Sequence, residues 1–112
     1  MHRIVFPTNE KMSYISKVES TFMDSEYLTV LHVTGQKITE VELVKNTHPH
    51  SSEEIIKECK ENKYKVLISP EDKELPLKEM KKNGISVFTT SESKNVLNTF
   101  TDFIQDKLIK SA

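Results

Sequence analysis

Two β-strand patterns separated by a short turn occupy residues 27–44 and leave few folds open to the chain. The apolar stretches are Tyr27-Leu-Thr-Val-Leu-His-Val33 and Ile38-Thr-Glu-Val-Glu-Leu-Val44, and Thr34-Gly-Gln-Lys37 lies between them. Gly35 supplies the positive φ that a type II′ turn requires at its first central position. The second stretch alternates apolar residues with Glu40 and Glu42, a pattern typical of a strand near a sheet edge. We therefore predict an antiparallel hairpin with one solvated face.

The rest of the chain alternates between strand and helix patterns. Apolar residues with helical spacing predict three helices, and short apolar runs predict three more strands. Strands that are separated by single helices are parallel with right-handed crossovers, so the sheet is mixed. We predict one α/β domain over residues 1–112 with three layers, a five-stranded mixed sheet and the element order β-β-β-α-β-α-β-α. The expected strands outside the hairpin are 4–6, 66–68 and 85–88, and the expected helices are about 51–63, 77–83 and 96–108.

One connection is long for a compact domain. Residues 9–26 form 18 positions without a clear helix or strand pattern. The segment is nevertheless apolar, because it contains Tyr14, Ile15, Val18, Phe22 and Met23. We expect it to fold back and cover one end of the sheet.

Composition limits the environment and the partners of the chain. The 16 Lys and Arg residues nearly balance the 17 Asp and Glu residues, which argues against a nucleic-acid partner. No segment approaches the roughly 20 apolar residues that cross a bilayer, and the N-terminal apolar run is too short for a signal peptide. The single cysteine, Cys59, excludes an internal disulfide. We therefore expect a cytoplasmic protein without a membrane partner.

The stretch Lys45–Glu54, KNTHPHSSEE, contains two of the four histidines and precedes the first predicted helix. Pro49 favours a polyproline-like path, so the rings of His48 and His50 diverge rather than chelate one ion. Cys59 lies about 12 Å further along the helix axis, which makes a closed site from these three residues improbable. Its apolar helical neighbours predict that Cys59 belongs to the core. Ser51-Ser-Glu-Glu54 is a capping box and explains the helix start without a ligand.

Catalytic patterns find little support in the chain. The first predicted strand carries no carboxylate that could begin a two-metal nuclease site. The two glycines, Gly35 and Gly84, do not form a glycine-rich phosphate loop. His32 lies inside a predicted strand, where a paired or partly exposed sheet residue is a simpler interpretation than a ligand. We expect a protein that is not an enzyme.

Four segments resemble the dinitrogenase iron–molybdenum cofactor biosynthesis domain, and the similarity extends over nearly the whole chain. The segments are Ile-Val-Phe-Pro-Thr at 4–8, Lys37-Ile38 after the turn, Asn46-Thr-His48, and Asn-Gly-Ile-Ser-Val-Phe at 83–88. The resemblance implies a ribonuclease H-like fold with strand order 3-2-1-4-5. Members of this nitrogen-fixation family include small carriers of nitrogenase cofactor or of its iron–sulfur precursor.

The chain also departs from this family in two places. Thr21-Phe-Met-Asp-Ser25 stands where members commonly have His-Phe-Gly-Arg-Ala, so that only Phe22 is kept. Ser69–Pro76 has no glycine and three carboxylates where members are usually glycine-rich, and this loop should repel an anionic cluster. Asn46-Thr-His48 matches the family's Asn-Pro-His, which makes His48 the family-matched ligand.

Two functions follow from these observations. The first is a non-catalytic carrier of iron–molybdenum cofactor or an iron–sulfur precursor, with His48 as metal ligand, His50 as a helper and Phe22 as a shielding residue. The expected partner is a cofactor-assembly or nitrogenase-type protein. The alternative is a degenerate family member without cluster binding that acts as a protein-interaction or regulatory module.

Overall fold

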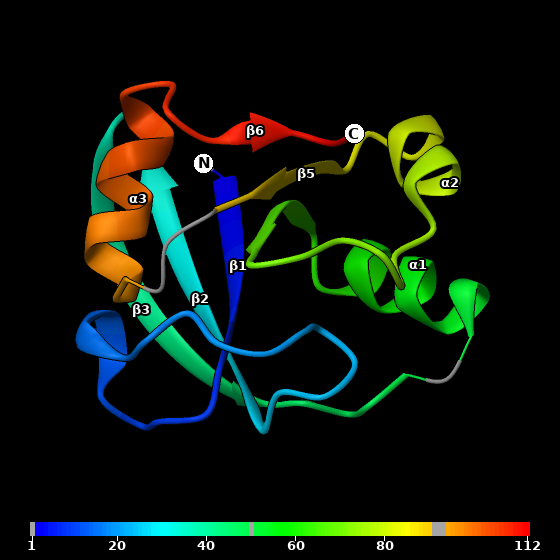
Figure 1. The fold of residues 1–112 in the computed structure, drawn as a ribbon, viewed down its shortest axis with the longest axis horizontal. Coiled ribbons are helices and arrows are strands. Elements are labelled where there is room, and N and C mark those ends of the chain that lie inside the picture. Colours follow the sequence, from blue (N-terminus) through cyan, green and yellow to red (C-terminus); the bar gives the residue numbers. More distant parts are fainter. Residues whose placement is uncertain (1, 50, 91–93) are drawn as a thin grey trace.

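The computed structural model describes residues 2–49, 51–90 and 94–112, and its centre is a six-stranded mixed sheet in the order β3-β2-β1-β4-β5-β6 (Figure 1). β1, β4 and β5 are parallel to one another, whereas β2, β3 and β6 each pair antiparallel with a neighbour. The elements are β1 His2–Thr8, η1 Ser13–Ile15, β2 Tyr27–Thr34, β3 Lys37–Lys45, α1 Ser52–Glu61, β4 Tyr64–Ser69, α2 Leu77–Lys82, β5 Ser86–Thr89, α3 Val96–Ile104 and β6 Ile109–Lys110. The predicted α/β class, element order and strand order 3-2-1-4-5 are confirmed.

The sixth strand is an addition to the predicted five. The α3 helix was expected to continue to Leu108, but it ends at Ile104. Asp106 has a φ of 59°, and the amide of Lys107 donates to Asp102 O at 2.9 Å, so the chain turns back at this point. Leu108 still packs against the apolar cluster beside α3, which explains its helical spacing in the sequence.

The hairpin forms as predicted. Thr34 pairs with Lys37 across a two-residue loop, and Gly35 has a φ of 64°. An L-residue at this φ is strained, so glycine is required by the backbone rather than by a close neighbour.

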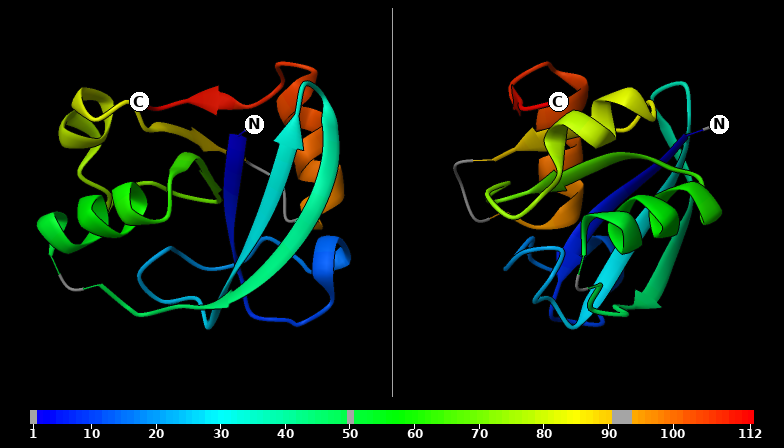
Figure 2. Two further views of the ribbon diagram at one scale, coloured as in Figure 1. Left: turned by 180° about the vertical axis from the view of Figure 1, so that it is seen from behind. Right: turned by 90° about the vertical axis from the view of Figure 1, so that its right-hand side faces the viewer.

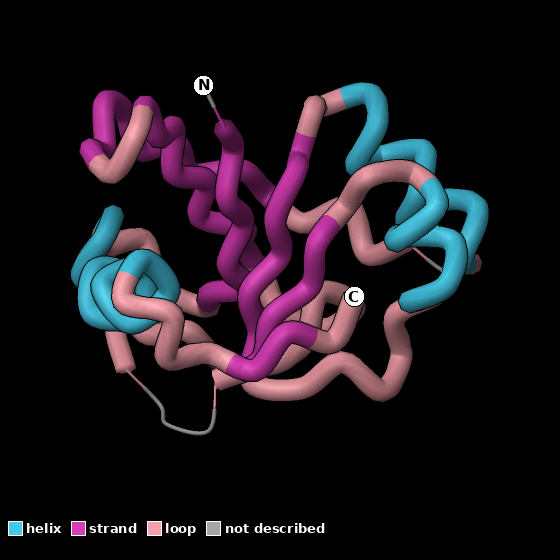
Figure 3. The backbone as a smooth tube through the Cα atoms, turned by 90° about the horizontal axis from the view of Figure 1, so that it is seen from above, coloured by secondary structure: helices cyan, strands magenta, loops and turns pink. Residues whose placement is uncertain are grey.

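Helices cover both faces of the sheet (Figures 2 and 3). On one face, Val5, Val30 and Leu67 pack with residues of α1 and α2, including Ile55 and Met80. The apolar cluster on the opposite face joins the sheet to α3 and consists of Ile4, Phe6, Val18, Leu31, Val33, Ile68, Val96 and Phe100. The strict alternation along β1 therefore divides the core into two layers, as the three-layer prediction requires.

Pro7 lies inside β1, although a strand end was expected there. Pro7 pairs with Leu28, and its carbonyl accepts a hydrogen bond from the amide of Glu19 at 3.0 Å. The N–H and C=O of one strand residue point to the same side, so the missing N–H of Pro7 faces residue 19 and not β2. The β1–β2 ladder therefore loses no hydrogen bond.

The connection between β1 and β2 folds back over one end of the sheet, as expected. Val18 is fully buried and Phe22 is 6% exposed, which stabilises the fold by roughly 1.5–3 kcal/mol for each side chain. Val18 also bridges to Thr8, and the amide of Val96 donates to Ser16 O at 2.8 Å. Tyr14 and Ile15 of η1, by contrast, are exposed.

The helices of the described residues are too short and too polar to cross a bilayer.

Candidate ligand site at His48

Asn46 holds the connection between β3 and α1 against residues 22–25. Its side chain is buried, and Nδ2 donates to the carbonyls of Phe22 and Ser25, both at 2.8 Å. Its Oδ1 accepts a hydrogen bond from the amide of His48 at 3.0 Å. One buried amide thus fixes both backbone segments that approach His48.

His48 is exposed, but its ring has a fixed direction. The residue has a φ of 53°, in the left-handed region that histidine enters more often than most residues other than glycine. Its Nδ1 lies 3.0 Å from the carbonyl oxygen of Met23, and since a carbonyl only accepts, Nδ1 carries the proton. In the neutral ring, the lone pair then lies on Nε2. Metal-binding histidines in proteins commonly have this arrangement, in which the second nitrogen donates to a carbonyl or carboxylate.

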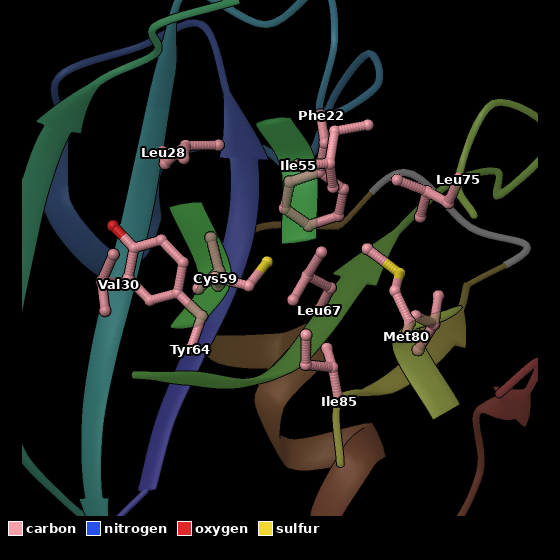
Figure 4. Close-up of a cluster of buried hydrophobic side chains, with 12 residues drawn as sticks. Phe22, Leu28, Val30, Ile55, Cys59, Tyr64, Leu67, Leu75, Met80 and Ile85 are labelled. Carbon is pink, nitrogen blue, oxygen red and sulfur yellow. The ribbon is translucent and has the colours of Figure 1, made fainter. Parts of the chain in front are cut away.

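The other two predicted ligand-binding residues are not brought together with this ring. His50 lies outside the described residues. The ring of Phe22 belongs to the buried cluster that also contains Ile55 and Cys59 (Figure 4), and it approaches the His48 segment through its backbone carbonyl. The roles of His50 and Phe22 stay predictions.

An open groove lies beside His48 along the surface of α1. The groove measures about 310 Å³ and is lined by three glutamates and one lysine in addition to Thr47, His48, Pro49 and Asn62. Thr47 donates to one of the glutamates, Glu58, at 2.6 Å. The surroundings of the His48 ring are therefore acidic on this side. The charged residues are Glu54, Lys57, Glu58 and Glu61.

A smaller apolar cavity lies below this surface, between α1 and the sheet. Its volume of about 30 Å³ is lined by Phe22, Asn46, Cys59 and Tyr64 among others. This space admits at most a few atoms, whereas sites for small ligands usually measure about 300–1,000 Å³. This cavity is therefore too small for a metal cluster.

Within the described ranges, no group of three or more His, Cys, Asp or Glu residues is placed to hold a metal ion. His32 is buried in β2, with Nε2 at 2.8 Å from Glu42 and Nδ1 at 3.5 Å from Glu40. Each carboxylate contacts a different ring nitrogen, so both pair with the imidazole. The pairing predicted for His32 is confirmed.

Two further reactive side chains are made inert by burial. Cys59 lies in the core as predicted. Burial raises the pKa of its thiol to about 12, and the negative charge of Glu58 makes a smaller contribution to this rise. Burial, with a smaller contribution from Glu42, also raises the pKa of Tyr64 to about 12. Both groups keep their protons at neutral pH, so neither supplies an anionic nucleophile or metal ligand there.

The α1 helix begins as the capping-box pattern predicts. Ser51 is the N-cap, and its Oγ accepts a hydrogen bond from the amide of Glu54 at 3.2 Å. The loop after β4 is likewise the acidic turn expected from the sequence, with Glu71 and Glu74 exposed. Neither feature forms a metal-binding group of three or more His, Cys, Asp or Glu residues among the residues that the structure describes.

The position of the Met23 carbonyl is the part of this site that sequence reasoning missed. Asn46 and His48 were singled out as a short motif, but a backbone carbonyl carries no signal in the sequence. The contact joins residues that are 25 positions apart, and it exists because Asn46 anchors the connecting segments.

Comparisons with known proteins agree on the fold. No family model matches the chain, and no curated protein sequence matches it. Solved structures do match over nearly their whole length. A "putative NifB protein" from Thermotoga, described as a member of the DUF35 family, is 21% identical, with a TM-score of 0.76 and coverage of 98% of this chain and 93% of that chain.

Two further solved structures give the same result. The apo form of the orange protein from Desulfovibrio gigas is 16% identical, with a TM-score of 0.75 and coverage of 100% and 94% of the two chains. A "putative dinitrogenase" from Methanocaldococcus jannaschii is 16% identical, with a TM-score of 0.68 and coverage of 98% and 94%. The chain therefore has the fold of proteins named as a putative NifB protein, a putative dinitrogenase and the orange protein, and it is a divergent example of that fold.

Proposed function

We propose that this chain is a non-catalytic carrier domain that holds a metal cluster through Nε2 of His48. The observation that carries the proposal is the hydrogen bond from Nδ1 of His48 to Met23 O, which directs the lone pair of Nε2 to the surface. Such an outer contact orients the ring and raises its basicity as a ligand.

The cargo that fits best is an iron–sulfur precursor or the iron–molybdenum cofactor. The shared fold includes proteins named as a "putative NifB protein" and a "putative dinitrogenase". Iron accepts imidazole as a ligand. A single exposed protein ligand holds a preformed cluster loosely, which suits delivery to a cofactor-assembly or nitrogenase-type partner better than permanent storage.

The properties of the buried reactive groups support a role without catalysis. The thiol of Cys59 and the phenol of Tyr64 both have a pKa of about 12 and stay neutral at physiological pH. The cavity beside them is too small for a substrate. Cargo binding at the surface requires neither group.

A second candidate function is an interaction or regulatory module without a cluster. The specific observation in its favour is the charge of the groove beside His48, where three glutamates outnumber one lysine. An anionic cluster would be repelled there, most strongly at low ionic strength. The two candidates therefore differ in one measurable property, namely cluster retention.

The test compares iron retention by three forms of the protein. Each is purified without oxygen, incubated separately with isolated iron–molybdenum cofactor and with a reconstituted iron–sulfur cluster, and passed over a gel-filtration column. We expect iron to comigrate with the wild type and with His2→Ala, a control at another exposed histidine, and to be lost from His48→Ala.

Two results would contradict the carrier proposal. If no iron comigrates with the wild type, the second candidate is favoured. If His48→Ala retains as much iron as the wild type, His48 is not the ligand.

A further inference from the structure

The outer edge of β3 is open over the described part of the sheet. β3 is the last strand in the order β3-β2-β1-β4-β5-β6 and pairs with β2 alone (Figure 2). Its nine residues, Lys37–Lys45, exceed the usual strand length of about five or six. An open edge of this length is a template for another strand.

The hydrogen-bond pattern shows which backbone groups face outward. The amide of Asn46 donates to Glu26 O at 3.0 Å, and the register places Leu28 opposite Val44. Hydrogen-bonded and non-bonded pairs alternate in an antiparallel ladder, so Val41 and Leu43 occupy non-bonded positions. Their N–H and C=O groups therefore point away from β2.

The middle of the α3 side of this edge is apolar. Val41 packs against the core there, and Leu43 is 42% exposed. A surface groove of about 500 Å³ lies beside it and is lined by Tyr14 of η1, Ile38, Thr39, Glu40, Val41 and Leu97. With Met12 and Ile15, Tyr14 and Leu43 make up four of the five large apolar side chains that are exposed among the described residues.

The α1 side of the same edge is acidic. The side chains of Glu40 and Glu42 are 67% and 49% exposed, and both contact the buried ring of His32. The imidazole fixes the two carboxylates beside each other on one face of β3. A strand placed against this edge thus meets carboxylates on one face and apolar side chains on the other.

We propose that the β3 edge binds an extended segment of a partner protein whose side chains alternate between basic and apolar. The segment continues the sheet through the outward groups of Val41 and Leu43. Its basic side chains lie beside Glu40 and Glu42, and its apolar side chains cover Leu43 and Tyr14. Backbone pairing provides affinity in such strand addition, and the alternate side chains provide specificity.

The charges of β3 disfavour a second copy of the chain as the occupant. Two copies related by a two-fold axis form a continuous sheet only if the α3 side of both copies lies on the same side of the joined sheet. Every such register centred between Glu40 and Glu42 places glutamate opposite glutamate. Like charges directly opposite each other on two strands are destabilising. Basic side chains of a partner strand would instead attract Glu40 and Glu42.

The test uses synthetic peptides about six residues long and the isotope-labelled wild-type protein. The probe alternates lysine and valine. One control has the same composition with lysines and valines grouped, and another is N-methylated at the residues that face β3. Hydrogen exchange of the Val41 and Leu43 amides is measured by NMR. At a free peptide concentration ten times its Kd, we expect exchange of these amides to slow about tenfold with the alternating probe.

Variants separate strand pairing from simple charge attraction. Glu40→Gln and Glu42→Gln should each weaken binding of the probe by about 1.4- to fivefold, whereas Glu53→Gln on α1 should leave it unchanged. Equal binding of the N-methylated or grouped control would overturn the proposal. It would also be overturned by unprotected Val41 and Leu43 amides at saturation, or by a dimer in sedimentation that protects them without peptide.

Discussion

Removal of the Asn46 side chain tests whether this residue organises the candidate site. In Asn46→Ala, the buried carbonyls of Phe22 and Ser25 lose their donor, and the His48 amide loses its acceptor. An unpaired buried polar group costs about 1–3 kcal/mol, so we expect a loss of about 2–4 kcal/mol once the segments relax. This is a large share of a typical stability of about 5–15 kcal/mol.

Urea denaturation of wild type and variants measures this loss. Asn46→Asp keeps the shape but lacks the N–H donors and buries a charge, so it should be at least as destabilising as Asn46→Ala. Asn98→Ala on α3 removes an exposed asparagine and should change the free energy of unfolding by less than about 0.5 kcal/mol. The reasoning is refuted if Asn46→Ala costs no more than Asn98→Ala, or if Asn46→Asp matches the wild type.

Three further predictions concern local features of the fold. The folded Cys59 thiol and Tyr64 phenol have pKa values of about 12 against 9.0 and 10.0 when unperturbed. The raised pKa of each group contributes to the stability of the fold, and this contribution is fully present below the unperturbed pKa. Thermal melts should therefore show Tm falling as pH rises from about 9 to 12, and a constant Tm would contradict the raised pKa values. Ser51→Ala should cost about 0.5–2 kcal/mol in urea denaturation, because the Glu54 amide loses its cap, and an unchanged midpoint would argue against that cap. In Gly35→Ala, the added Cβ meets no neighbouring atom, but the backbone keeps a φ of 64°. Denaturation should therefore show a free energy of unfolding that is about 1–2 kcal/mol lower because of backbone strain alone, and a stabilised variant would contradict this.

The parts of the fold that could be predicted depend on local chemistry. The hairpin follows from Gly35, and the start of α1 follows from Ser51 and Glu54, because each signal acts within a few residues. The extra strand β6 was missed because two residues carry no period, and Leu108 fits a helical stripe although it packs after a turn.

The parts that could not be predicted depend on contacts between distant segments. β1 continues through Pro7 because the partner on that side is Glu19, which no strand rule foresees. His48 could be selected as a ligand from its resemblance to the family. Its ring direction, however, depends on Met23 O and on Asn46, and these contacts exist only in the folded chain.

Coordination by Nε2 of His48 is the central claim, and pulsed electron paramagnetic resonance tests it directly. The protein is produced with ¹⁵N-labelled histidine, loaded with a reconstituted iron–sulfur cluster and reduced to a paramagnetic state. We predict a ¹⁵N hyperfine coupling in wild type and in His2→Ala that disappears in His48→Ala. A cluster bound to wild type without this coupling, or the same coupling in His48→Ala, would contradict it.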